Sequence, residues 1–186
     1  MSQALKFLGI CGSLRKTSYN RSALLAAQEL LPEAVTLKIF DLDGLPMFNQ
    51  DLEGEPSDKV LEFKRLIREA DAIVIATPEY NYSIPGVLKN AIDLASRPYG
   101  DSAWAGKPVA ILGASVGALG TARAQYHLRQ TFVFLDMLAV NQPEVMIGHA
   151  AKAFDAQGRL VDETSRKLLR QLLDTLARAT RHRSLK

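Results

Sequence analysis

Short apolar segments alternate along the chain with longer segments in which apolar residues recur every three or four positions. A strand buried on both faces is apolar throughout, so the short segments predict strands over Leu5–Cys11, Val35–Phe40, 72–77 and Pro108–Ala114, with a broken fifth strand over 137–140 and Val145–Ile147. Helical spacing predicts helices over residues 20–31, 57–70, 84–95, 119–134 and 162–180. In the second helix the positions at this spacing are Val60, Leu61, Lys64 and Ile67.

This alternation of strands and helices predicts an α/β fold with a parallel sheet covered on both faces. Five strands within 186 residues favour a flavodoxin-like three-layer sandwich, in which the strand order is 2-1-3-4-5. The sequence shows no internal repeat, low-complexity tract or domain linker, so we expect a single domain over residues 1–186. Residues 41–56, rich in Asp, Glu, Gly and Pro, are expected to form a loop.

The composition excludes several classes of protein. A single cysteine excludes a disulfide framework and any CxxC-type zinc or redox motif. No apolar run approaches the ~20 residues of a membrane-spanning helix, and residues 1–6 lack the features that begin a signal peptide. We therefore expect a soluble cytoplasmic protein without a membrane partner.

The formal net charge of +3 comes from the C-terminal stretch, which contains Arg178, Arg181, Arg183 and Lys186. A basic tail can bind the phosphate backbone of a nucleic acid. We favour the simpler interpretation, a solvated helix end whose cations interact favourably with the helix dipole. No nucleic-acid partner is expected.

The loop after the first strand has the groups of a phosphate site. In such sheets ligands bind beyond the carboxyl ends of the strands, near the switch point between strands 1 and 3. The loop opens into a helix N-terminus, which favours anions, and its side chains supply hydroxyl, guanidinium and amide groups: Ser13, Arg15, Thr17, Ser18 and Asn20. It matches neither a Walker A loop nor GxGxxG, although a Rossmann interpretation would make Asp41 a ribose ligand. A plain helix cap at Ser18 or Asn20 is the alternative.

Two further loops reach the same edge of the predicted sheet. The loop after the third strand lies between Pro78 and Pro85, which stiffen the backbone, and it contains two aromatic residues, an amide and a carboxylate: Glu79, Tyr80, Asn81 and Tyr82. These could hold a flat heterocycle against a tyrosine ring, or the tyrosines could simply pack over the sheet edge. The loop after the fourth strand, residues 113–120, carries Ser115 among glycines that allow either a planar ligand or tight packing.

The remaining reactive side chains indicate no additional site. Cys11 lies within the first strand and is interpreted as a small core residue. The three histidines are too scattered for a metal site: His127, His149 and His182. Three positions recur at three-residue spacing along the fourth helix, as a solvated face or a subunit contact: Arg123, Tyr126 and Arg129.

Two motifs carry a resemblance to a known family. They are Gly12-Ser13-Leu14-Arg15 followed by Ser18 and Asn20, and Pro78-Glu79-Tyr80-Asn81-Tyr82-Ser83-Ile84-Pro85-Gly86 followed by Lys89-Asn90-Ala91-Ile92-Asp93. With them, and with Ala105-Gly106-Lys107-Pro108 and residues 125–129, the chain resembles the NAD(P)H-dependent FMN reductase family over almost its whole length, and most closely its quinone and chromate reductases. Thr17 stands where the family often has Gly and Tyr19 where it often has Phe; neither change removes a ligand group.

The resemblance implies an FMN at the carboxyl edge of the sheet, with NADPH or NADH as co-substrate. The implied flavin site contains Ser13, Arg15, Thr17, Ser18 and Asn20 around the phosphate, Pro78, Glu79, Tyr80, Asn81 and Tyr82 at the isoalloxazine, and Ser115 on its far side. Asp41 then has no ribose role. The implied protein is a homodimer or homotetramer.

The implied reaction is a ping-pong transfer of two electrons as hydride from the nicotinamide to quinones or similar acceptors, among them chromate, azo and nitro compounds. It requires no side chain as general acid, because the flavin carries the chemistry. Two alternatives stay open: a flavin reductase that supplies reduced FMN to a partner monooxygenase, and a flavodoxin-like electron carrier without reductase activity of its own.

Overall fold

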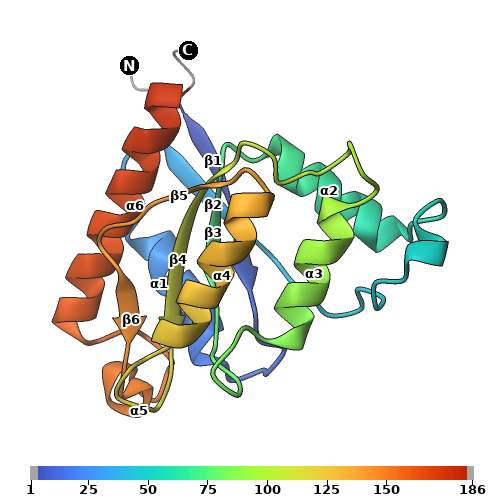
Figure 1. The fold of residues 1–186 in the computed structure, drawn as a ribbon. Helices are drawn as coiled ribbons and strands as arrows, with labels where there is room; N and C mark the ends of the chain where they lie inside the picture. The colour runs from blue at the N-terminus through green and yellow to red at the C-terminus, as the bar shows by residue number, and fades with distance from the viewer. Residues whose placement is uncertain (1–3, 184–186) are drawn as a thin grey trace.

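A parallel sheet lies between two layers of helices in the computed structural model, which describes residues 4–183 (Figure 1). Its strands are β1 (Leu5–Cys11), β2 (Val35–Phe40), β3 (Ala72–Ala76), β4 (Pro108–Ala114), β5 (Leu138–Ala139) and β6 (Val145–Ile147). Its helices are α1 (Tyr19–Glu29), the 3-10 helix η1 (Gln50–Leu52), α2 (Asp58–Glu69), α3 (Gly86–Ser96), α4 (Ala122–Phe134), α5 (Ala150–Ala153) and α6 (Glu163–Arg183). None of the helices in this part of the chain combines the length and apolar character needed to cross a membrane.

The strand order β2-β1-β3-β4-β5 confirms the predicted order. β5 pairs with the first two residues of β4, and β6 pairs with Leu112–Ala114 at the other end of the same strand. The two short strands therefore share the fifth position, and the broken fifth strand is confirmed.

Alternate residues of the central strands face opposite helical layers. Phe7 and Val74 belong to the core cluster that includes α1 and α6, whereas Leu8 and Ile73 belong to the cluster that includes α2, α3 and α4. β3 and β4 are buried along their whole length, which explains why their sequences are continuously apolar rather than alternating.

Several predicted boundaries shift by a few residues. α3 begins at Gly86 rather than at 84, because Pro85 is its extended N-cap, and α4 begins at Ala122 rather than at 119. Leu61, predicted on the packed face of α2, is 51% exposed, and Phe63 is buried there instead. η1 and α5 were not predicted, since elements of three or four residues carry no periodic signal.

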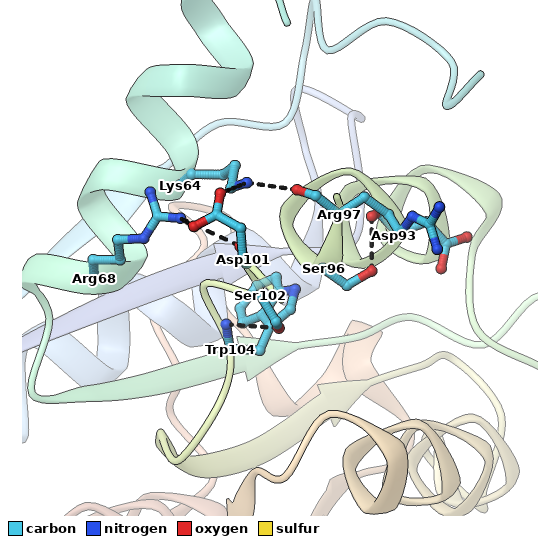
Figure 2. Close-up of polar contacts among 8 residues, drawn as sticks. All are labelled: Lys64, Arg68, Asp93, Ser96, Arg97, Asp101, Ser102 and Trp104. Atoms are coloured by element: carbon cyan, nitrogen blue, oxygen red, sulfur yellow. Dashed lines mark hydrogen bonds and ion pairs between the residues drawn. The ribbon is translucent and has the colours of Figure 1, made fainter. Parts of the chain in front are cut away.

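Lys64 is the unusual member of the packed face of α2, since it is a buried lysine. Its ammonium donates to the carbonyl oxygen of Arg97 at 2.5 Å and to Oδ2 of Asp101 at 2.6 Å, and Arg68 reaches the other carboxylate oxygen at 2.6 Å (Figure 2). The hydrogen bond from Lys64 is the largest cause that lowers the pKa of Asp101. These contacts fasten α2 to the loop that leads from α3 into β4, at the amino edge of the sheet.

The C-terminal helix is longer than predicted and extends at least to Arg183, the last described residue. Its last turn holds Arg181, His182 and Arg183, where cations favour the helix dipole. Lys186, which the sequence interpretation included in the basic cluster, lies outside the described residues.

Candidate functional site

The loops that follow β1, β3 and β4 meet at one end of the sheet, at the lower end of the molecule in Figure 1. They enclose a cavity of about 200 Å³. It is lined by Ser13, Arg15, Ser18, Tyr19, Asn20, Pro78, Glu79, Tyr80, Ala114, Ser115 and Val116. The structure thus brings together eight of the eleven predicted site residues.

The other three predicted residues border this cavity rather than line it. Thr17 lines an adjoining cavity of about 500 Å³, which shares Arg15, Ser18 and Tyr19 with the first. Asn81 and Tyr82 lie on the exposed turn that follows Tyr80. The predicted residues therefore form one continuous surface at the carboxyl edge of the sheet.

The loop after β1 presents unpaired donors at a helix N-terminus. Ser18 is the N-cap of α1, its hydroxyl accepts from the N–H of Arg21 at 3.4 Å, and the first turn contains no acidic residue. Within residues 4–183, the N–H groups of Thr17 and Tyr19 have no protein acceptor. Free N–H groups and the helix dipole favour an anion at this position.

Gly12 allows the loop to lie close to its neighbours. A Cβ at this position would be 3.1 Å from Cδ of Pro78 and 3.2 Å from Cδ2 of Leu88. The loop after β1 therefore rests directly against the loop after β3, which places the two predicted halves of the site side by side.

Asn20 braces the site from within. Its side chain is buried, and its amide spans the backbone of Ala114 at the end of β4: Nδ2 donates to the carbonyl oxygen at 3.0 Å, and Oδ1 accepts from the N–H at 2.9 Å. The side chain that was predicted as a phosphate ligand is thus directed at the sheet. It holds the start of α1 against β4.

Residues 80–83 form a tight turn closed by two backbone hydrogen bonds of 3.0 Å, one in each direction between Tyr80 and Ser83. Asn81 and Tyr82 have φ values of 50° and 65°, the left-handed pattern of a type I′ turn. Their N–H groups have no acceptor within residues 4–183. The turn therefore presents two backbone donors at the carboxyl edge of the sheet.

Glu79 directs its carboxylate away from the turn and into the start of α4. Oε2 accepts from the backbone N–H of Arg123 at 3.0 Å and of Ala124 at 3.2 Å, while Oε1 accepts from Nε of Arg123 at 2.5 Å. The Arg123 guanidinium lies 3.6 Å from the centre of the Tyr82 ring. The Glu79 side chain is only 6% exposed, so its acceptor sites are used by α4.

The end of β4, which leads into the third loop, packs tightly at Gly113. A Cβ on Gly113 would lie 1.8 Å from Oγ1 of Thr121 and 2.5 Å from the carbonyl oxygen of Thr77. Ser115, two residues further on, accepts from the N–H of Gly117 through its hydroxyl at 3.3 Å. Gly113 thus permits β4 to approach β3 and α4 closely enough to bring Ser115 to the cavity.

The other residues singled out in the sequence have structural partners. Cys11 is buried as predicted, and burial raises the pKa of its thiol. Asp41 forms an ion pair with Arg21 of α1. Residues 4–183 contain no group of three or more His, Cys, Asp or Glu side chains arranged to hold a metal ion.

Arg123 is the residue near the site that sequence reasoning missed. It was assigned, with Tyr126 and Arg129, to a solvated face or a subunit contact, whereas its guanidinium joins Glu79 to Tyr82. Arg129 instead donates to the carbonyl oxygen of Val140 and to Oδ1 of Asn141. The only signal available was the position of Arg123 in the first turn of the helix after the third loop.

Comparison with known proteins agrees with this geometry. Residues 5–152 match the model of the NADPH-dependent FMN reductase family. The chain is 55% identical to the NAD(P)H-dependent FMN reductase PA1204 of Pseudomonas aeruginosa over 95% of both proteins, and 46% identical to a 2-hydroxy-1,4-benzoquinone reductase of a Burkholderia species over 97% of this chain and 98% of that protein. The solved structure of FerB, a flavoenzyme NAD(P)H:(acceptor) oxidoreductase from Paracoccus denitrificans, superposes with a TM-score of 0.88 at 35% identity, covering 96% of this chain and 98% of that one. This chain belongs to the NADPH-dependent FMN reductase family.

Proposed function

We propose that this protein is an FMN-dependent NAD(P)H oxidoreductase that reduces quinones and similar acceptors, with chromate, azo and nitro compounds as further candidates. As in its family, FMN is the cofactor and a reduced nicotinamide is the electron donor. The observation that carries the proposal is the cavity at the carboxyl edge of the sheet, where a loop with unpaired donors faces a turn with unpaired donors.

The residues present fit FMN. Its phosphate would be held by Ser13, Arg15, Thr17 and Ser18 together with the free N–H groups at the start of α1, a donor set suited to a dianion. Asn20 would shape this cradle through its brace to β4. Its ring would lie against residues 78–82, with Ser115 on the far side. The absence of an acidic side chain from the first turn of α1 supports the phosphate assignment, because a carboxylate there would repel it.

The chemistry that FMN supplies when bound is two-electron transfer between a reduced nicotinamide and an acceptor, which we propose occurs in ping-pong order. The protein contributes position and charge. The N–H groups of Asn81 and Tyr82 would donate to the edge of the ring and favour negative charge there. Arg15 and the helix N-terminus would neutralise the phosphate. No side chain is proposed as a general acid.

An open site suits acceptors of varied shape. Tyr80 is 48% exposed and Tyr82 is 66% exposed, so the turn leaves one side of the cavity accessible. The relative named 2-hydroxy-1,4-benzoquinone reductase supports a quinone as the principal acceptor.

We further propose a cytoplasmic homodimer or homotetramer built on one flavin-binding domain. The end of α4 and the start of β5 expose Val133, Phe134 and Leu138, which are 84%, 77% and 51% exposed. Apolar side chains gathered in this way mark contact surfaces. Light scattering at several protein concentrations tests the oligomer, and a monomer throughout would contradict it.

The test of the function is titration of the apoprotein with FMN, followed by oxidation of NADPH and NADH with 1,4-benzoquinone. We expect quenching of flavin fluorescence, turnover with quinone, and parallel double-reciprocal lines. FMN lost during gel filtration, with fast reduction of free FMN, would favour the flavin reductase. Bound FMN without oxidation of either nucleotide would favour the electron carrier, and protein that never binds FMN would contradict the proposal.

A further inference from the structure

The 80–83 turn adopts a conformation that its own residues do not favour. Asn81 and Tyr82 both have positive φ, which is uncommon for side chains other than glycine and marked in a bulky aromatic residue. Only the two hydrogen bonds between Tyr80 and Ser83 close the turn. Something outside the turn must therefore stabilise it.

The start of α4 supplies that support. The Arg123 guanidinium lies over the Tyr82 ring, and Nδ1 of His127 lies 3.0 Å from Oγ of Ser83. Both contacts come from α4; one reaches the second central residue of the turn and the other reaches its last residue. The position of the 80–83 turn therefore depends on how firmly the first turns of α4 are held.

Glu79 in turn fixes the start of α4. The side chain of Thr121, the N-cap of this helix, accepts from no backbone N–H of the first turn, and the first turn contains no acidic residue. The Glu79 carboxylate takes the place of a cap by accepting from the N–H groups of Arg123 and Ala124. It also accepts from the Arg123 side chain, which orients the guanidinium over Tyr82.

We propose that Glu79 is a positioning residue for the flavin. Its carboxylate caps α4 and orients Arg123, and so holds the Asn81 and Tyr82 N–H groups in place before FMN arrives. This inference rests on the proposed function, which assigns those N–H groups to the ring. It gives the Glu79 carboxylate, which faces α4, a role through the turn rather than a contact with the cofactor.

The first experiment is Glu79→Gln in the apoprotein. The amide keeps the shape but replaces one acceptor oxygen by a donor that faces the donors of α4. We expect amide hydrogen exchange of Tyr80, Ser83, Arg123 and Ala124 to accelerate about tenfold, the equivalent of losing one charge-assisted hydrogen bond. Because FMN would bind only the ordered turn, its dissociation constant should rise as the reciprocal of the ordered fraction of the apoprotein turn, which the exchange rates measure.

The matched control is Glu53→Gln, which breaks another glutamate–arginine pair. Glu53 and Arg97 are 17% and 16% exposed, and Nε of Arg97 lies 2.6 Å from Oε1 of Glu53; neither residue lines the cavity of the site. This variant should lose stability while its turn exchange and its FMN dissociation constant stay at wild-type values. If both variants weaken FMN binding equally, Glu79 acts only through global stability and the proposal fails.

A second variant keeps the proposal testable if Glu79→Gln does not fold. Arg123→Gln leaves the two backbone N–H groups on the carboxylate and removes only the guanidinium, so exchange at Tyr80 and Ser83 should rise while exchange at Ala124 does not. Unchanged exchange at the turn in a folded variant would overturn the proposal, as would an FMN dissociation constant that does not follow the ordered fraction measured by exchange. If the wild-type protein bound no FMN, the proposed function would fail, whereas the exchange measurements on the apoprotein would still show whether Glu79 holds the turn.

Discussion

Replacement of Asn20 by alanine should cost far more than the loss of one polar side chain usually does. Its amide satisfies both the N–H and the carbonyl oxygen of Ala114, at 2.9 and 3.0 Å, in a buried position. Asn20→Ala leaves both backbone groups without a partner, at about 1–3 kcal/mol each. Allowing for some access of water, we expect a loss of about 2–4 kcal/mol, a large part of the ~5–15 kcal/mol that stabilises a typical domain.

Asn20→Asp turns the same brace into a pH-dependent one. A protonated carboxyl can accept from the N–H of Ala114 and donate to its carbonyl oxygen, whereas the ionised form can only accept. The folded state therefore raises the pKa of the introduced carboxyl above its unfolded value of ~3.9. The variant should approach wild-type stability below ~pH 4 and lose stability as the pH rises through the folded pKa, above which the loss is constant.

Urea unfolding of wild type and variants between pH 4 and pH 8 measures both effects. Asn90 is a matched control, because its buried side chain braces another loop in the same way: Oδ1 accepts from the N–H of Phe48 at 2.7 Å, and Nδ2 donates to the carbonyl oxygen of Pro46 at 2.9 Å. Asn90→Asp should show the same pH trend, while only the Asn20 variants weaken FMN binding. A loss below 0.5 kcal/mol for Asn20→Ala, or no pH trend for Asn20→Asp relative to wild type, would refute the reasoning.

Two other substitutions and one measurement of thiol reactivity test neighbouring parts of the structure. Gly113→Ala places a Cβ against a carbonyl oxygen at 2.5 Å and should destabilise by about 3 kcal/mol in urea unfolding; a near-neutral result would contradict this packing. Asp101→Asn removes the charged partner of Lys64 and should cost ~1 kcal/mol after solvent screening. Because the pKa of Asp101 is lowered, this difference from wild type should be full above ~pH 4 and vanish as the pH falls through the folded pKa; a difference that grew in acid would be incompatible. The Cys11 thiol, buried and with a raised pKa, should react with a disulfide reagent far more slowly in the native protein than in urea, and equal rates would show that it is accessible.

The sequence predicted the sheet well because its strands carry an unambiguous signal. β1, β2, β4 and β6 have the predicted bounds, since apolar runs of strand length bounded by glycine, proline or charged residues leave little choice. The predicted ends of the helices differ more from the structure than those of the strands. The start of α4 depends on how residues 115–121 pack against β6, for which no local pattern exists, and the four residues of α5 span little more than one helical period, too few to show a repeat.

The site was predicted as a set of loops but not as a set of roles. The switch-point rule and the donors of each loop located the cavity, and the resemblance to the family ranked the residues. Where the Asn20 and Glu79 side chains point depends on partners 94 and 44 residues away. The local spacing of residues does not reveal such long-range contacts. From the sequence, a residue that holds two elements together therefore cannot be distinguished from a residue that binds the ligand.

This distinction changes how the site should bind its cofactor. Asn20 ties the phosphate loop to β4, Glu79 ties the turn to α4, and the close approach at Gly113 fixes the third loop between them. The groups left for the ligand are then largely backbone N–H groups, already oriented by side chains that do not touch it. A cavity ordered in advance loses less conformational entropy on binding. A substitution that removes one of these contacts should therefore weaken the affinity for FMN in proportion to the disorder it causes. Substitution of Asn81, whose exposed side chain makes no hydrogen bond to residues 4–183, should by the same reasoning matter only where the new residue cannot hold its positive φ.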